Sequence, residues 1–340
     1  MREGGDRADR EFCRGILPKV SRTFALGIRL LPSGLEEAVR TSYLLCRIAD
    51  TIEDSAELPA ARKDVLLAEL RRCLDDAQAD ASPLTGAFPA PRTDEEALVR
   101  ECDRVLRVFR GLSAEERDAV RPWVQEMARG MAEFAQRRGT RDGLAALASV
   151  AELDRYCYYV AGTVGHLLTG LFRIHHGRMT AARTARLESL ATSFGLGLQL
   201  TNIIKDVADD RRRGWSFVPR DLCELAGVRP DDLQDPSHGA EARQVMATLI
   251  AKARSHLHDA LLYCMTLPAA AYRIRIFCLT SLYFAVRTLH LAERDPRLLD
   301  PGHKVKITRA EVYRTVVATH FIAPFDPLVR GYFLHLAGGR

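Results

Sequence analysis

The stretch Gly195-Leu196-Gly197-Leu198-Gln199-Leu200-Thr201-Asn202-Ile203-Ile204-Lys205-Asp206-Val207-Ala208-Asp209-Asp210 combines an apolar helical pattern with a row of metal-ligand side chains. At helical period, Asn202, Asp206 and Asp210 fall on one face, while the leucine, isoleucine and valine residues supply the buried positions. Carboxylates in successive turns repel one another, so a mostly buried row needs a cation beside it. The stretch therefore predicts a helix over residues 184–210 that carries a cation site.

A second acidic row, Asp50-Thr51-Ile52-Glu53-Asp54, ends a helix that we expect over residues 35–54. Asp50 and Asp54 share a face, and Glu53 belongs to the same acidic end. Such spacing is common on solvated helix faces, but the preceding residues here are apolar, which indicates a mostly buried helix. Two acidic rows of this kind predict one divided, oxygen-rich site that suits Mg²⁺ bridging protein carboxylates to a diphosphate.

Composition indicates an ordinary globular chain that is helical throughout. Its 340 residues are 47% apolar and 27% charged, and β-branched runs are scarce. We expect a disordered N-terminus over residues 1–11 and a single all-α domain over residues 12–340. The long helices are predicted over residues 35–54, 114–138, 142–172, 184–210, 241–267 and 269–292, with a start or a kink at Pro122.

Charge, cysteine usage and hydropathy exclude several classes of partner and environment. The net charge of +5 is mild and arginine is spread along the chain, so nucleic acid is not expected as a partner. The eight cysteines form no CxxC pair and predict buried free thiols in a reducing, cytoplasmic environment. The longest apolar run, residues 276–286, is too short to span a bilayer, which leaves peripheral membrane contact open.

Several polar and aromatic segments have two interpretations. Ser21-Arg22 is either an anion-binding corner or a helix cap followed by a solvated arginine. Arg47 is either an ion-pair partner of Asp50 or a phosphate ligand. The run Arg211-Arg212-Arg213 either neutralises a helix end or forms a flap over an anionic substrate.

The segment Tyr156-Cys157-Tyr158-Tyr159-Val160-Ala161-Gly162 leaves a similar choice. Its tyrosines either pack in the core or place one phenol in a cavity beside the metal site. Glycines in a helix are unfavourable unless another part of the chain approaches the backbone, so Gly162 and Gly165 indicate a close contact.

Taken in order, the two acidic rows, the tyrosine segment and Phe217-Val218-Pro219 resemble the squalene/phytoene synthase family, the head-to-head prenyl transferases, over residues 20–314. The resemblance implies an isoprenoid-synthase helical bundle around a central apolar cavity. The two acidic motifs would face each other at its mouth and bind Mg²⁺ and prenyl diphosphate. Mg²⁺ and basic side chains would stabilise the charge on the departing diphosphate, and the apolar cavity would protect the carbocation from water.

The resemblance also implies roles for individual residues. Tyr159 stands where the family places the phenol implicated in proton removal, and it would act in catalysis together with Asp50, Asp54, Asp206 and Asp210. Metal binding is expected at Asp50, Glu53, Asp54, Asn202, Asp206 and Asp210. Diphosphate binding is expected at Ser21, Arg22, Arg47, Lys205 and Arg212. Cofactor phosphate is expected at Arg22, Arg47, Lys205, Lys306 and Arg309. The cavity lining is expected to include Phe24, Tyr43, Val160, Gly162, Gly165, Gln199 and Phe277.

The first hypothesis is a reducing squalene synthase that works as a monomer. It would join two farnesyl diphosphates into presqualene diphosphate and reduce this intermediate with NADPH. Lys304-Val305-Lys306-Ile307 resembles the segment of such enzymes that contacts NADPH, although Thr308 stands at the expected arginine. The run 209–214 resembles phytoene synthases instead. The alternatives are a non-reducing phytoene- or dehydrosqualene-type synthase, a prenyl diphosphate cyclase, and a non-catalytic lipid-binding or assembly protein.

Overall fold

The computed structural model describes residues 2–135 and 144–339, without the side chains of residues 2–5, 22 and 23. The chain forms two compact units, Met1–Gln136 with Thr163–Thr184, and Arg137–Gly162 with Ala185–Arg340. In the described part, regular structure is helical except for one pair of two-residue strands, which confirms the all-α prediction. The expected helix end at residue 138 and helix start at residue 142 lie outside the described residues.

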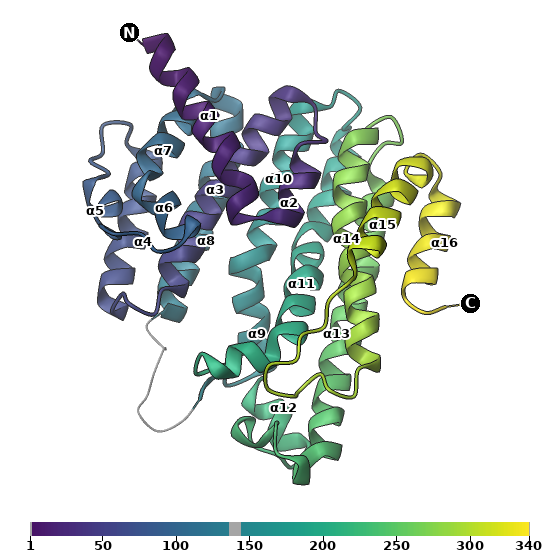
Figure 1. The fold of residues 1–340 in the computed structure, drawn as a ribbon. Coiled ribbons are helices and arrows are strands. Elements are labelled where there is room, and N and C mark those ends of the chain that lie inside the picture. The colour runs from purple at the N-terminus through teal and green to yellow at the C-terminus, as the bar shows by residue number, and fades with distance from the viewer. Residues whose placement is uncertain (1, 136–143, 340) are drawn as a thin grey trace. The chain divides into compact units, whose positions relative to one another are not determined.

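The first unit is built from helices alone in the part that the structure describes (Figure 1). They are α1 (Arg2–Val20), α2 (Arg22–Ile28), α3 (Ser33–Asp54), α4 (Ala60–Asp75), α5 (Ser82–Thr85), α6 (Asp94–Arg100), α7 (Cys102–Gly111), α8 (Ala114–Ala135) and α10 (Thr163–His175). The apolar positions of α3 face α8, α7 and α6. Helix α8 passes through Pro122 without ending, so no helix starts there.

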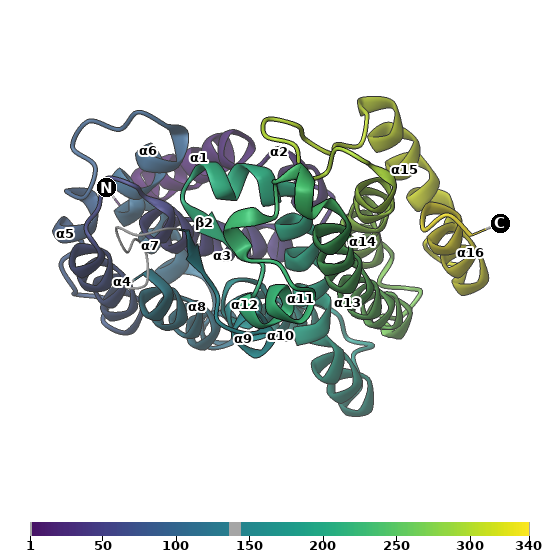
Figure 2. The same ribbon diagram turned by 90° about the horizontal axis from the view of Figure 1, so that it is seen from below.

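The second unit holds the long helices of the C-terminal half. It contains β1 (Ala145–Ala146), α9 (Val150–Cys157), the π-helical turn η1 (Tyr158–Gly162), most of α11 (Ala181–Arg212), β2 (Trp215–Ser216), α12 (Arg220–Leu225), η2 (Pro230–Asp232), η3 (Pro236–His238), α13 (Gly239–Thr266), α14 (Tyr272–Arg294), α15 (Arg309–Ile322) and α16 (Asp326–Leu336). Seen from below, α13, α14 and α15 follow one another, and α16 lies beside α15 (Figure 2).

Helix α14 is the core helix of this unit. By length and composition it is the one helix in residues 2–135 and 144–339 that is long and apolar enough to cross a membrane. In its most apolar window, 78% is buried inside the protein, as in the core helix of a soluble fold. All eight cysteines are free thiols, and all but Cys46 are buried, which confirms the prediction of buried thiols.

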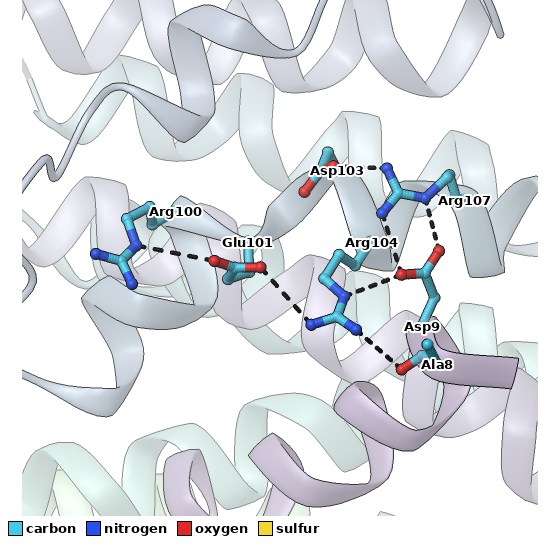
Figure 3. Close-up of polar contacts among 7 residues, drawn as sticks. All are labelled: Ala8, Asp9, Arg100, Glu101, Asp103, Arg104 and Arg107. Atoms are coloured by element: carbon cyan, nitrogen blue, oxygen red, sulfur yellow. Dashed lines mark hydrogen bonds and ion pairs between the residues drawn. The ribbon is translucent and has the colours of Figure 1, made fainter. Parts of the chain in front are cut away.

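The N-terminus differs from the prediction, because α1 begins at Arg2 where disorder was expected up to residue 11. The physical reason is an ion-pair cluster that binds α1 to α7 (Figure 3). Asp9 is only 5% exposed and accepts hydrogen bonds from Arg104 Nε at 2.9 Å and Arg107 Nε at 2.6 Å. Arg104 also donates to the carbonyl oxygen of Ala8 at 3.0 Å and lies over the ring of Phe12.

We expect Asp9→Asn to lower the free energy of unfolding by about 2 kcal/mol at neutral pH, because hydrogen bonds to charged groups are lost. The hydrogen bond from Arg107 is the main reason that the pKa of Asp9 lies below its ordinary value. The carboxylate therefore stabilises the fold above its unfolded pKa, and this contribution is lost as pH falls through the folded pKa.

Urea unfolding of the parent and Asp9→Asn proteins, from neutral pH down to about pH 3, measures this difference. The difference in the free energy of unfolding between the two proteins should become smaller as the solution becomes acidic. Asp118→Asn is the control, since that side chain is 70% exposed and pairs only with Arg121 in the described residues. If this difference in the free energy of unfolding does not change with pH, the charge of Asp9 does not stabilise the fold.

The glycines of α11 allow a direct backbone contact with η1. A Cβ atom built on Gly195 would stand 2.3 Å from the carbonyl oxygen of Ala161, and one on Gly197 would stand 3.1 Å from the backbone of His256 and Leu257. Gly162 is also confined, though less tightly, by the Tyr158 side chain at 3.1 Å and by side chains of α11. The expected close approach at Gly162 is thus confirmed, and α11 packs against η1 and α13 through glycine.

Gly195→Ala should destabilise the protein by about 1–3 kcal/mol, the usual cost of overpacking, because a backbone carbonyl cannot move aside as a side chain can. The matched control is Gly15→Ala in α1, where an added Cβ meets nothing within 4 Å. This control should gain up to about 1 kcal/mol from helix propensity. Thermal unfolding of both variants tests the contact, and equal melting temperatures would disprove it.

Candidate functional site

One face of α3 carries the first acidic motif. Tyr43, Arg47, Asp50 and Asp54 follow one another at spacings of four, three and four residues and are exposed or half-buried. The intervening apolar positions are buried, with Ile48, Ala49 and Ile52 at 0% exposure. The helical period therefore places one arginine and two carboxylates in a row on the open side of an otherwise buried helix.

A cavity of about 330 Å³ lies at the C-terminal end of this row, within the first unit. It is lined by Arg47, Asp50, Thr51, Asp54, Ser55, Ala56, Glu57, Phe88, Thr93, Glu95 and Glu96. Glu53 does not line it and is only 2% exposed. Of the three acidic residues predicted on α3, the structure thus opens Asp50 and Asp54 to the cavity and buries Glu53.

Arg47 lies between two carboxylates. Its Nη1 donates to Asp50, and its Nη2 donates to Glu95 Oε1 of α6 at 3.2 Å. Burial alone lowers the pKa of Arg47, but the nearby acidic groups outweigh this effect, so the pKa is raised and the guanidinium stays charged. Sequence analysis did not identify Glu95, although three successive acidic residues at the start of α6 mark this helix end.

Helix α2 brings further predicted residues to Tyr43. Ser21 caps α2, since its hydroxyl accepts from Phe24 N at 3.3 Å, and the Phe24 ring lies 5.8 Å from the Tyr43 ring. Burial raises the pKa of Tyr43, and a hydrogen bond with Ser21 acts in the opposite direction. The structure confirms the cap at Ser21, while the side chain of Arg22 lies outside the described residues.

The second acidic motif lies on one face of α11, in the second unit. Gln199, Asn202, Asp206 and Asp210 are exposed or half-buried, whereas Ile203, Ile204, Val207 and Ala208 are buried. Lys205 pairs with Asp206, and both side chains are about a third exposed, at 28% and 33%. Arg213 pairs with Asp210 at 3.1 Å. Each carboxylate of the predicted row is therefore balanced by a neighbouring cation.

The three arginines after α11 are engaged within their own unit. Arg211 donates to the carbonyl oxygens of Pro230 and Asp231, the latter at 2.7 Å. Arg212 pairs with Asp209, and Arg213 pairs with Asp210 as described above. These contacts favour the interpretation in which the arginines neutralise the helix end. Arg212, predicted to hold diphosphate, pairs with Asp209, a carboxylate that the prediction did not include.

Asp209 ties a distant segment to the end of α11. It is 7% exposed and pairs with Lys304 as well as Arg212, and the hydrogen bond from Lys304 is the main cause of its lowered pKa. Val305 is buried at 6% exposure, whereas Lys306 and Arg309 are exposed. The segment proposed to bind cofactor phosphate is thus fixed beside the second acidic motif.

The tyrosine segment begins in the last turn of α9, and its residues Tyr158–Gly162 form the π-helical turn η1, a geometry that often marks functional positions. Tyr159 is 7% exposed, and its ring lies 5.4 Å from that of Tyr158. Gly195, which η1 touches, stands one turn before Gln199 on the same face of α11. Tyr159 therefore belongs to a segment that packs along the helix face bearing the second acidic motif.

The predicted cavity residues are divided between the units. Phe24, Tyr43 and the buried Gly165 of α10 belong to the first unit. The second unit contains Val160, Gly162, Gln199 and Phe277, of which Phe277 is 5% exposed on α14.

Neither acidic motif forms a complete metal site by itself. Across residues 2–135 and 144–339, no group of three or more His, Cys, Asp and Glu side chains is arranged to hold a metal ion. The open face of each motif nevertheless presents carboxylate oxygens, and Mg²⁺ is commonly held by one or two carboxylates together with substrate phosphates. The donor chemistry therefore fits Mg²⁺ in the presence of a phosphorylated ligand.

Comparisons with known proteins agree with this arrangement. The squalene/phytoene synthase family matches residues 17–311. Squalene synthase of Schizosaccharomyces pombe is 30% identical over 294 residues, 86% of this chain and 62% of that protein. Squalene synthase 1 of Panax ginseng is 30% identical over 283 residues, 82% of this chain and 63% of that protein. The solved structure of TcSQS with the ligand BPH1237 has a TM-score of 0.83 at 28% identity, covering 97% of this chain and 92% of that chain.

The helical fold and its two acid-bearing helices define an all-α protein of the isoprenoid-synthase class. The chain belongs to the squalene/phytoene synthase family. It spans 62% and 63% of the lengths of the two squalene synthases named above.

The contact between Glu95 and Arg47 leads to a binding prediction. Glu95→Gln should weaken the binding of inorganic pyrophosphate with Mg²⁺ about tenfold, since a charge-assisted hydrogen bond that positions the guanidinium is lost. The matched control is Glu96→Gln, which removes the same charge from the same cavity, although Glu96 accepts from Arg92 N at 2.6 Å and not from Arg47. Titration calorimetry compares the two, and equal affinities would rule out the positioning role.

Proposed function

We propose that the protein is a squalene synthase, which joins two farnesyl diphosphates head to head and reduces the product with NADPH. The observation that carries this proposal is the row of Arg47, Asp50 and Asp54 lining a cavity in a chain of this family. The likeness to squalene synthases of yeast and plant origin supports the choice of substrate.

Asp50, Asp54, Asn202, Asp206 and Asp210 would hold Mg²⁺. The metal would supply positive charge to the departing diphosphate. Arg47 and Lys205 already stand beside these carboxylates, and each can turn from a carboxylate to a diphosphate oxygen. Their ion pairs are partly exposed and each contributes about 1 kcal/mol or less, so little free energy is needed to break them when diphosphate binds.

Tyr159 would hold or move the proton that leaves during closure of the cyclopropane ring. Its near-complete burial excludes water from the phenol, as a carbocation requires. The backbone contact between η1 and Gly195 fixes the segment from which the phenol projects. Ser21, which caps α2, would bind diphosphate through its hydroxyl.

NADPH would bind the basic segment whose Lys304 pairs with Asp209 of α11. Lys306 and Arg309 are exposed there and would bind the cofactor phosphate. Thr308, which replaces the arginine of the family pattern, caps α15: it accepts from Glu311 N at 3.2 Å, and Glu311 accepts from Thr308 N at 2.9 Å. The loss of a cation at Thr308 is the observation that favours a second candidate, a non-reducing synthase of the phytoene or dehydrosqualene type.

Incubation with farnesyl diphosphate and Mg²⁺, with and without NADPH, followed by mass analysis, tests the proposal. We expect squalene only when NADPH is present. Asp50→Asn and Asp206→Asn should each lower kcat about 100-fold or more, since each removes a charge that acts at the departing diphosphate.

The control variant is Asp118→Asn, an exposed carboxylate of α8, which should keep full activity. Presqualene diphosphate or dehydrosqualene as the final product, regardless of NADPH, would replace the proposal by the non-reducing candidate. Full activity of both Asp50→Asn and Asp206→Asn would refute the proposal that the acidic rows hold Mg²⁺ for catalysis.

A further inference from the structure

The last turn of α3 lacks the positive charge that usually stabilises the C-terminal end of a helix. It carries Glu53 and Asp54 and no basic residue. Carboxylates are unfavourable at this end, because the unpaired carbonyl oxygens there already carry partial negative charge. Positive charge at the last turn of the helix that bears the first acidic motif therefore has to come from another helix.

Lys63 of α4 provides this charge. Its Nζ donates to the backbone carbonyl oxygen of Glu53 at 2.7 Å, and the residue is 2% exposed. Glu53 is the next-to-last residue of α3, where carbonyl oxygens have no partner within the helix. The amide of Glu57, which would bond to this carbonyl if the helix continued, donates to the Ser55 hydroxyl at 3.3 Å. The lysine thus takes the place of the next helical turn.

The position of Lys63 is favoured neither by its own helix nor by burial. It lies in the first turn of α4, a helix N-terminus that carries partial positive charge and has no side-chain cap. A buried ammonium group also loses its hydration, which costs free energy unless hydrogen bonds or ion pairs offset it. The contact with α3 accounts for a lysine here, since an apolar side chain would be enough for the packing of α4.

The Lys63 contact joins two parts of the chain that line the cavity. Asp50 and Asp54 line it from α3, and Ser55 and Glu57 line it from the short connection to α4. Lys63 links the two ends of this connection, the last turn of α3 and the first turn of α4. The orientation of both carboxylates thereby depends on a residue that is not itself among those lining the cavity.

We propose that Lys63 is a positioning residue for the first acidic motif. Its ammonium group holds the last turn of α3 so that Asp50 and Asp54 face the cavity in the orientation that binds Mg²⁺ together with diphosphate. This inference rests on the proposed function, in which these two carboxylates hold the metal. Lys63 acts through the backbone of α3, and side chains that are fixed before a ligand arrives bind it more tightly.

The sign of the effect on affinity separates positioning from electrostatics. Lys63→Met removes the charge and the donor at nearly unchanged volume. If the charge acted only at a distance, its removal would tighten the binding of Mg²⁺, because a positive charge that repels the metal is lost. We expect the opposite result. Titration calorimetry with inorganic pyrophosphate should show about tenfold weaker binding, and the Mg²⁺ concentration for half-saturation should rise.

Arg121→Met is the matched control in the same unit. Arg121 of α8 donates through Nε to the carbonyl oxygen of Leu74 at 3.0 Å, in the last turn of α4, which carries no part of the motif. This variant should lower the melting temperature, as Lys63→Met does, but keep the affinity of the parent. Amide hydrogen exchange without ligand should become faster at residues 51–58 in Lys63→Met and at the end of α4 in Arg121→Met.

Affinity that is unchanged or tighter in Lys63→Met overturns the inference while the proposed function stands, and so does equal weakening in Lys63→Met and Arg121→Met. A parent protein that binds no pyrophosphate with Mg²⁺ overturns both. If Lys63→Met does not fold, Lys63→Gln gives the comparison, since it keeps an N–H donor without the charge. Weaker binding than the parent is expected, and unchanged binding refutes the role of the ammonium group.

Discussion

Repulsion between carboxylates on successive helical turns is the constraint around which both acidic helices are arranged. Each acidic row is accompanied by cations close at hand: Arg47 on α3, and Lys205 and Arg213 on and after α11. These pairs are partly exposed, so each contributes about 1 kcal/mol or less to stability. Their value lies in balancing the charge of the rows while leaving the cations close enough to meet an anionic ligand. The ion pairs of Asp9 serve a different purpose. This carboxylate is buried, and the two arginines that donate to it bind α1 to α7.

The sequence predicted the parts of the fold and site that depend on helical period. Apolar residues three and four apart determined which sides of α3 and α11 are buried, and the polar positions left over formed the two open faces. The glycine at residue 162 indicated a close backbone approach, and the structure has it at η1. Asp50 and Glu53 also show the limit of this reasoning. Both lie in one acidic run only three residues apart, yet Asp50 lines a cavity and Glu53 is 2% exposed, because the neighbouring helices and not the local spacing decide their burial.

The remaining contacts join residues far apart in the chain, and no local pattern specifies them. Glu95 reaches Arg47 from α6, and Lys304 reaches Asp209 from 95 residues further along the chain. The helical N-terminus has the same origin, because its charged residues read as a disordered tail until Arg104 and Arg107 are placed beside Asp9. The tertiary partner, and not propensity, decides whether such a segment is ordered. Thr308 is the local exception, since its spacing to Glu311 is that of a capping box.

Helix α15 shows why an apolar count cannot tell which side of a helix is buried. Tyr313, Val317 and Phe321 have the spacing of a core stripe, and by periodicity alone they would be placed inside. The structure places Thr315 and Thr319 there instead, because threonine hydroxyls can bond to backbone carbonyls of their own helix and so enter a tight helix contact. When small residues are enough to pack a helix against its neighbours, aromatic residues can stand on its outer face without weakening that packing.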